Sequence, residues 1–306
     1  DELSTWKEGP TKRAIIDFVA TVSNAGTPRL IPVDERIAIF DVDGTLWPER
    51  PLVEAAYVVS QLQSEPLADE RLREQEPFRT LLRADVDALP GIGSPEARAA
   101  LLRTHTGMTD EAFESSVRSF LSRARHPRYD VPYTALAYRP MRQLLRYLED
   151  HRFTIYLSTA GDERFVRAFA AETFGVPRER VIGSSFAKDV VFADGGATVL
   201  RRPEIDSLND GPEKVVNVSR HVGRRPAFAA GNVGKGGDIA MLEYTRGREG
   251  PSLAVVIHHD DPERELAYDE PDNRTLDAAR QHGFVVVSMK NDWLEVFAPP
   301  IAARRE

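Results

Sequence analysis

The chain has 306 residues, 42% hydrophobic, 29% charged and 8% aromatic, which is enough to bury a full core and argues against disordered, collagenous and low-complexity proteins. Its 40 basic and 48 acidic residues give a net charge of −8, so no general electrostatic attraction to nucleic acid or an anionic membrane is expected. The absence of cysteine excludes disulfides, zinc–thiolate sites and thiol catalysis.

The apolar runs at residues 252–257 and 284–289 are much shorter than the roughly 20 residues that span a bilayer, so we expect no membrane insertion. The chain begins at Asp1 rather than Met, which is compatible with a removed signal peptide or initiator segment. The sequence therefore leaves the compartment open between the cytoplasm and export, and it leaves the oligomeric state open.

The first half of the chain is predicted to contain one buried strand and many helices. Residues 11–22 carry apolar side chains at helical spacing. Residues 37–40 form a short apolar run that ends at Asp41, which is typical of a buried parallel strand. Between residues 51 and 130 no such run occurs, and segments 53–63, 76–89, 95–105 and 109–124 are predicted helices. This stretch is therefore predicted to be an all-helical insertion.

Beyond residue 140, helices and strands alternate. Helices are predicted at 141–149, 162–173, 212–221, 239–244 and 273–281, with a capping box of Asp210 and Glu213 before the third. Strands are predicted at 153–157, from 181, and at 227–230, 253–257 and 284–288, with a hairpin at 190–200 turning at 194–196. This alternation predicts an α/β fold with a mainly parallel sheet.

Polar side chains are concentrated where the predicted strands end. Because ligands of open parallel sheets bind outside the carboxyl ends of the strands, we expect these side chains to converge. The candidates are Asp41 and Asp43 after the first strand, Ser158 and Thr159 after the second, Lys214 at the head of a helix, and Asn232 and Asp238 after a later strand.

The order of these groups resembles the haloacid dehalogenase (HAD) superfamily, whose phosphatases carry Asp-x-Asp-Gly-Thr after the first strand. Residues 41–45 match that motif, Ser158 the second, Lys214 the third and residues 232–238 the fourth. The helical insertion is similar to the cap of the phosphoserine phosphatase-like branch. The resemblance implies a Rossmann-like three-layer core of residues 1–50 and 131–306, and an inserted all-helical cap domain of residues 51–130.

The resemblance also implies a Mg2+-dependent phosphatase that acts on a small phosphorylated metabolite through an aspartyl-phosphate intermediate. Asp41 would attack phosphorus, and Asp43 would protonate the leaving oxygen and then activate water. The phosphoryl group would contact Ser158, Thr159 and Lys214 together with Gly44 and Thr45. The metal ligands would be Asp41, the main-chain carbonyl of Asp43, Asn232 and Asp238.

Two departures from the family pattern concern the fourth motif. Asn232 stands where an acid is usual, and the loop to Asp238 is longer and contains a second ammonium group, Lys235. Asp238 would therefore bind the metal directly, bind it through water, or only orient Lys214. Lys214 is preferred as the family lysine because it precedes the strand, whereas Lys235 is a candidate for substrate contact.

Alternative functions remain open at this point. A phosphotransferase or phosphomutase would use the same aspartyl-phosphate chemistry, and a catalytically silent binding protein would keep the fold without the metal. A carbon–halogen hydrolase is disfavoured because a halide leaves without a proton, so it needs no acid at Asp43. Residues 258–261 (HHDD) are interpreted as a polar end of a strand rather than a separate metal site.

Overall fold

The computed structural model describes residues 2–64, 100, 102–193, 195–299 and 301. Seven strands form one sheet in the order β4-β3-β2-β1-β5-β6-β7, parallel throughout except for the β3–β4 pair. This confirms the predicted α/β class. The strands are β1 (Ile37–Phe40), β2 (Thr154–Asp162), β3 (Val181–Ala193), β4 (Gly196–Ser207), β5 (Phe228–Asn232), β6 (Leu253–His258) and β7 (Val285–Ser288).

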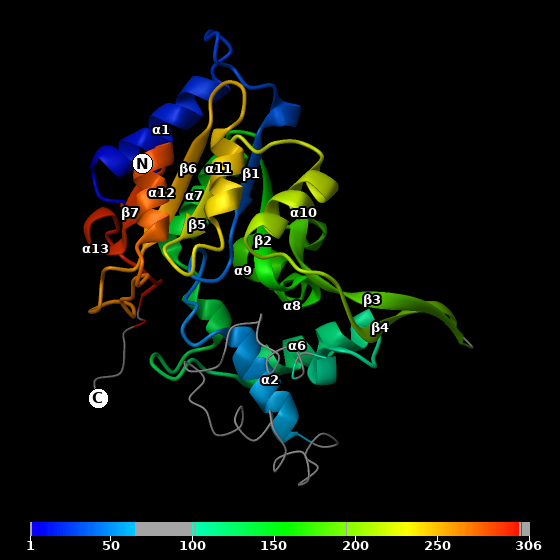
Figure 1. The fold of residues 1–306 in the computed structure, drawn as a ribbon. Helices are drawn as coiled ribbons and strands as arrows, with labels where there is room; N and C mark the ends of the chain where they lie inside the picture. Colours follow the sequence, from blue (N-terminus) through cyan, green and yellow to red (C-terminus); the bar gives the residue numbers. More distant parts are fainter. Residues whose placement is uncertain (1, 65–99, 101, 194, 300, 302–306) are drawn as a thin grey trace.

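Helices cover both faces of the sheet and make three layers, as predicted (Figure 1). One face packs on α1 (Pro10–Ser23), α7 (Arg139–Asp150) and α13 (Met289–Asp292). The other packs on α10 (Pro212–Val222), α11 (Ile239–Arg246) and α12 (Arg274–His282). Alternate strand residues serve the two faces: Phe40 belongs to the first core and Ile39 to the second.

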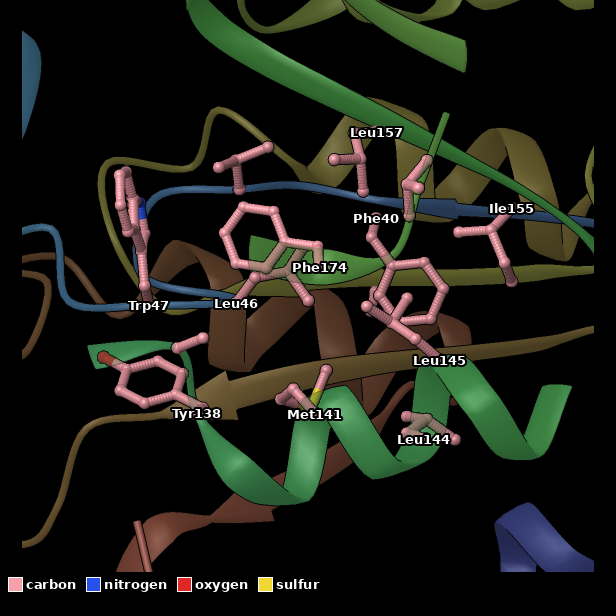
Figure 2. Packing of buried hydrophobic residues seen from close by; sticks show 14 of the residues in the cluster. Phe40, Leu46, Trp47, Tyr138, Met141, Leu144, Leu145, Ile155, Leu157 and Phe174 are labelled. Atoms are coloured by element: carbon pink, nitrogen blue, oxygen red, sulfur yellow. The ribbon is translucent and has the colours of Figure 1, made fainter. Parts of the chain in front are cut away.

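The core beside α7 fixes the end of β1. Figure 2 shows Met141, Leu144 and Leu145 of this helix beneath Phe40 of β1 and Leu157 of β2. Each of these side chains is fully buried, and such burial stabilises the fold by about 1.5–3 kcal/mol per large apolar side chain. The strand ends that carry the candidate site are therefore held rigidly.

Two predicted elements are wrong in detail. The helix predicted at 162–173 begins at Glu163, because β2 extends as far as Asp162. It is also divided into α8 (Glu163–Arg167) and α9 (Ala170–Phe174). The capping box before α10 does not form, since the N-cap is Gly211 and no side chain caps the helix. The Asp210 carboxylate instead accepts a hydrogen bond from the Gly211 N–H (2.9 Å).

The described part of the predicted insertion contains α2 (Val53–Gln63) and α6 (Asp110–Arg123). The predicted helix at 76–89 and most of that at 95–105 lie outside the described residues. In Figure 1, α2 and α6 lie below the carboxyl ends of β1 and β2, and the long β3–β4 hairpin extends beside them.

Residues 107–109 also pair with this hairpin. The Gly107 N–H donates to the Arg201 carbonyl and the Arg201 N–H donates to the Met108 carbonyl, both at 2.9 Å. The hairpin therefore contacts the segment that leads into α6, and the sequence did not predict this contact. None of the helices in the described ranges is long and apolar enough to cross a membrane.

Candidate active site

The loop after β1 presents two aspartates at the edge of the sheet. The Asp41 N–H still pairs with the Ala230 carbonyl of β5 (2.9 Å), after which the chain turns so that the Gly44 N–H donates to the Trp47 carbonyl (2.9 Å). Gly44 has a φ of 76°, and a Cβ there would lie 2.1 Å from the Asn232 side chain. Only glycine permits this close approach of the loop to Asn232.

Lys214 lies between two carboxylates at the centre of the site. Its Nζ donates to Asp41 Oδ1 (2.6 Å), Asp238 Oδ1 (2.7 Å) and the Ser158 carbonyl (3.2 Å), and all four residues are buried. Burial alone would lower the pKa of the Lys214 ammonium, but the charges of Asp238 and Asp41 outweigh it and raise the pKa. Two carboxylates face this one ammonium, and burial together with the charge of Asp238 raises the pKa of the Asp41 carboxyl, which the charge of Lys214 opposes.

Asp238 is fully engaged by the protein. Its Oδ1 binds Lys214, and its Oδ2 accepts the Asn232 N–H at 3.0 Å. A Cβ at Gly231 would lie 2.6 Å from the Asp238 side chain, so the carboxylate lies directly against the β5 backbone. This placement fits a group that orients Lys214.

Asp43 has the electrostatics of a general acid. It is half-buried, and its Oδ1 accepts a hydrogen bond from the Trp47 indole (2.9 Å). Burial raises the pKa of Asp43 to about 7, the Trp47 hydrogen bond opposes the rise, and the negative charges of Glu54 and Glu49 add to it. A carboxyl group with this pKa can both donate and accept a proton near neutral pH.

The hydroxyl of Ser158 is oriented by a buried amide. Asn209 Nδ2 donates to Ser158 Oγ (3.1 Å) and to the Thr159 carbonyl (2.8 Å). Because Ser158 Oγ accepts here, its own proton is left to donate to a ligand. Thr159 Oγ1 instead accepts the Gly161 N–H (3.0 Å), so this hydroxyl shapes the irregular end of β2.

The donors for a divalent cation are mainly oxygen atoms around Asp41. Among the described residues, Asp41 Oδ2 is paired only with the Thr45 hydroxyl (3.1 Å), and Asn232 Nδ2 donates to the Tyr268 hydroxyl (3.3 Å). In the ranges that the structure describes, no hydrogen bond is made to Asn232 Oδ1. No cluster of three or more His, Cys, Asp or Glu side chains suited to a metal occurs in those ranges. A carboxylate, an amide oxygen and a main-chain carbonyl fit Mg2+, which retains several waters.

The structure does not bring all the candidates together. Lys235 is exposed, and none of its described contacts is with the buried group around Lys214. The four side chains of residues 258–261 have separate partners, among them Asp269 for His258 (2.8 Å) and Ser288 for Asp260 (2.5 Å). They therefore do not converge as a metal site would, which agrees with the prediction of a polar strand end.

Sequence reasoning missed several residues that support the site. Asn209 orients Ser158, and its place beside an Asp-Gly turn gave no signal of that role. His259 contacts Glu265 Oε2 (3.0 Å) with one ring nitrogen and, with the other, the Gly44 carbonyl (2.8 Å) in the loop after β1. Glu54 of α2 accepts the N–H of Asp162, the last residue of β2. Apart from His259 and Glu265, each contact joins segments remote in sequence.

Comparison with known proteins adds the following findings. The sequence profile of the haloacid dehalogenase-like hydrolases matches residues 38–232. No curated protein matches the chain significantly. Among solved structures, a conserved functionally unknown protein from Anaerococcus prevotii DSM 20548 is 15% identical, with 94% of each chain covered and a TM-score of 0.60.

A protein with unknown function from Bordetella pertussis Tohama I is 19% identical over 83% of this chain and 98% of its own, with a TM-score of 0.50. A phosphoserine phosphohydrolase-like protein from Francisella tularensis subsp. tularensis SCHU S4 is 15% identical over 82% and 94%, with a TM-score of 0.40. At these identities the structural similarity shows the fold alone.

Proposed function

Because the chain belongs to the haloacid dehalogenase-like hydrolases, we propose that its site is that of a Mg2+-dependent phosphatase acting on a small phosphorylated metabolite. The observation that carries this proposal is the buried contact of Lys214 with Asp41 (2.6 Å), Asp238 (2.7 Å) and the Ser158 carbonyl (3.2 Å). It joins four sequence positions into one group in which a carboxylate nucleophile and phosphate-binding donors are adjacent.

Asp41 acts as the nucleophile. One of its carboxylate oxygens attacks phosphorus, the bond to the leaving oxygen breaks, and an aspartyl phosphate results. Asp41, the Asp43 carbonyl and Asn232 would hold Mg2+, which when bound would supply positive charge to the phosphoryl oxygens. Water then cleaves the acyl phosphate and restores the carboxylate.

Asp43 transfers the protons. In the first step it gives its proton to the leaving alkoxide, and in the second it takes a proton from the attacking water. A pKa of about 7 suits both steps, because neither protonation state is strongly favoured at neutral pH. This role distinguishes a phosphatase from an enzyme that expels halide.

Ser158 and Lys214 bind the phosphoryl group. The Ser158 hydroxyl donates to one oxygen, and Lys214 places an ammonium beside the same charge. Asp238 holds Lys214 in this position, and we assign it that role rather than direct metal binding. Thr159, Gly44 and Thr45 shape the loops that surround the phosphate.

We assign residues 51–130, of which the structure describes α2 and α6, to a cap over a core of residues 1–50 and 131–306, as in the phosphoserine phosphatase-like branch. A cap excludes water and bulky substrates, which favours a small phosphate ester. A phosphotransferase or phosphomutase is the second candidate, since the same residues would serve it with a hydroxyl acceptor in place of water.

The test is phosphate release from a panel of small phosphate monoesters, with Mg2+ and with chelator. We expect Mg2+-dependent release that is lost in Asp41→Asn and retained in Asp17→Asn, which removes an exposed carboxylate from α1. Transfer of phosphate to an added alcohol or sugar instead of water would support the transferase. Absence of both release and any Mg2+ effect on thermal stability would support a silent binding protein.

A further inference from the structure

We propose that Glu54, on the first cap helix, is a positioning residue that holds residues 159–162, the irregular end of β2, as a neutral carboxylic acid and shares its proton with His105. The inference deepens the proposed function and rests on it for its kinetic part. It assigns to the cap a residue that orders the end of β2 after Ser158 without adding negative charge beside an anionic substrate.

The Glu54 carboxyl lies directly against the backbone at the end of β2. Its Oε1 and Oε2 accept the Asp162 N–H at 3.1 and 3.3 Å. A Cβ at Gly161 would lie 2.1 Å from Glu54 Oε2 and 3.4 Å from Thr159 Oγ1. Glycine at position 161 thus makes room for a carboxyl group delivered by the cap, and the Glu54 side chain is buried.

The hydrogen bonds around His105 locate the proton. Thr104 Oγ1 lies 2.9 Å from the Ala100 carbonyl, which can only accept, so the one hydroxyl proton is used there. His105 Nδ1 lies 2.8 Å from the same hydroxyl oxygen and must therefore donate to it. In a neutral ring Nε2 is then an acceptor, and its partner at 3.2 Å is Glu54 Oε1. The proton between them belongs to Glu54.

The remaining assignment is an imidazolium beside a carboxylate, and the surroundings disfavour it. The His105 side chain is fully buried among the aromatic rings of Tyr57, Phe113 and Phe186, with centroids at 5.4, 4.8 and 6.1 Å. A cation in such a place loses its hydration. Burial lowers the pKa of His105 to about 3 and raises that of Glu54 to about 7, which agrees with a neutral pair.

The charge of Arg201 favours the ionised form of Glu54, but among the described residues Arg201 makes no contact with the Glu54 carboxyl. The titratable and charged groups that interact with it come from β2, β4, the loop after β1, the 102–106 segment and α2 itself: Asp162, Arg201, Asp43, His105 and Tyr57. Arg201 is already paired with Asp162 and Asp110. Within the described ranges, His105 is the only basic group that contacts the Glu54 carboxyl.

The charge state of Glu54 affects the general acid, because a negative charge on Glu54 raises the pKa of Asp43. A carboxylate near enough to act on Asp43 would also repel a phosphate monoester. As pH rises through the range in which Glu54 ionises, substrate binding is expected to weaken, so KM rises. Glutamine has nearly the shape of the protonated acid, and its amide would donate to His105 and accept from Asp162.

The first experiment measures 15N shifts of the His105 ring in the full chain and in Glu54→Gln, from about pH 5 to about pH 7, where a free histidine titrates. We expect a neutral ring protonated on Nδ1 in both proteins and an unchanged melting temperature for the variant. An imidazolium, an Nε2-protonated ring or failure of Glu54→Gln to fold would overturn the proposal, since a charged pair cannot be replaced by an amide. This readout needs no activity, so it stands even if the phosphatase proposal fails.

The second experiment follows KM and kcat against pH with a hydrolysed phosphate ester. For the unmodified chain we expect a several-fold rise in KM above neutral pH, which is absent in Glu54→Gln while the alkaline fall in kcat persists. Glu111→Gln, an exposed carboxylate of the cap helix α6, should keep the unmodified profile. An identical KM profile in Glu54→Gln would refute the role of Glu54 in charge control.

Discussion

Two buried cations of this protein are each held between two carboxylates, one in the candidate site and one where the cap meets the core. The groups are Asp41–Lys214–Asp238 and Asp110–Arg201–Asp162. Asp110 also pairs with Arg164 (2.9 Å) and Lys188 (3.4 Å), so the two groups differ in the number of cations and in whether any ligand capacity is left over.

The Arg201 group is closed. Its guanidinium donates to both carboxylates and to the His105 carbonyl (2.5 Å), and it lies over the Phe113 ring with its carbon 4.2 Å from the centroid. Within the described ranges the Lys214 group is open, because Asp41 Oδ2 is paired only with a hydroxyl at 3.1 Å. The comparison teaches that a buried triad of charges indicates chemistry when a carboxylate oxygen is spare, and structure when every donor and acceptor is matched.

The largest expected effect separates the two groups by activity. Asp41→Asn should lower turnover by about 1000-fold or more, because an amide is a poor nucleophile, while thermal stability stays near that of the unmodified chain. Phosphate release and thermal melting measure the two effects. Turnover within tenfold of the unmodified protein would exclude Asp41 as the nucleophile.

The next effect concerns the closed group. Arg201→Met removes the cation that pairs with the buried Asp162, while Asp110 keeps Arg164 and Lys188, and it should destabilise the fold by about 3–5 kcal/mol in urea unfolding. Arg202→Met, at the adjacent exposed position, is the matched control and should unfold near the unmodified midpoint. Equal midpoints for the two variants would show that Arg201 is not a structural anchor.

A smaller effect tests whether Asp238 orients Lys214 while Asn232 binds the metal. Asp238→Asn should lower kcat by about 10- to 100-fold through loss of Lys214 orientation, with Mg2+ affinity nearly unchanged. Asn232→Asp should tighten Mg2+ binding by about tenfold, because it adds a charge to an oxygen ligand. Calorimetric titration of Mg2+ measures both affinities. A large loss of affinity in Asp238→Asn would make Asp238 a direct ligand.

The smallest effect is a dependence on leaving group and pH. Hydrolysis of alkyl phosphates should slow as pH rises through about 7, where Asp43 loses the proton it donates. Asp43→Asn should therefore impair alkyl phosphates more than p-nitrophenyl phosphate, whose leaving group needs no proton. Because the folded pKa is raised, the stability contributed by protonated Asp43 is lost between about pH 4 and about pH 7. Equal impairment of both substrates would contradict the acid role.

Much of the fold followed from local patterns. The apolar run 37–40 became β1, and the alternation beyond residue 140 became the parallel sheet, because burial on both faces imposes a continuous apolar run on a strand. The capping box at Asp210 failed because Gly211 takes a positive φ of 58°, which lets the chain enter α10 without a side-chain cap.

The sequence by itself determined the α/β class and the set that converges on Asp41, because parallel strands end at one edge of a sheet and polar residues at those ends must meet. Tertiary structure alone decided the rest. Three contacts depend on how α2, α6 and the β3–β4 hairpin lie against the rest of the sheet. Asn209 donates to Ser158, Glu54 accepts from Asp162 at the end of β2, and Arg201 lies between two carboxylates. Local periodicity encodes which face of an element is buried, whereas these pairings are fixed by the packing of segments remote in sequence.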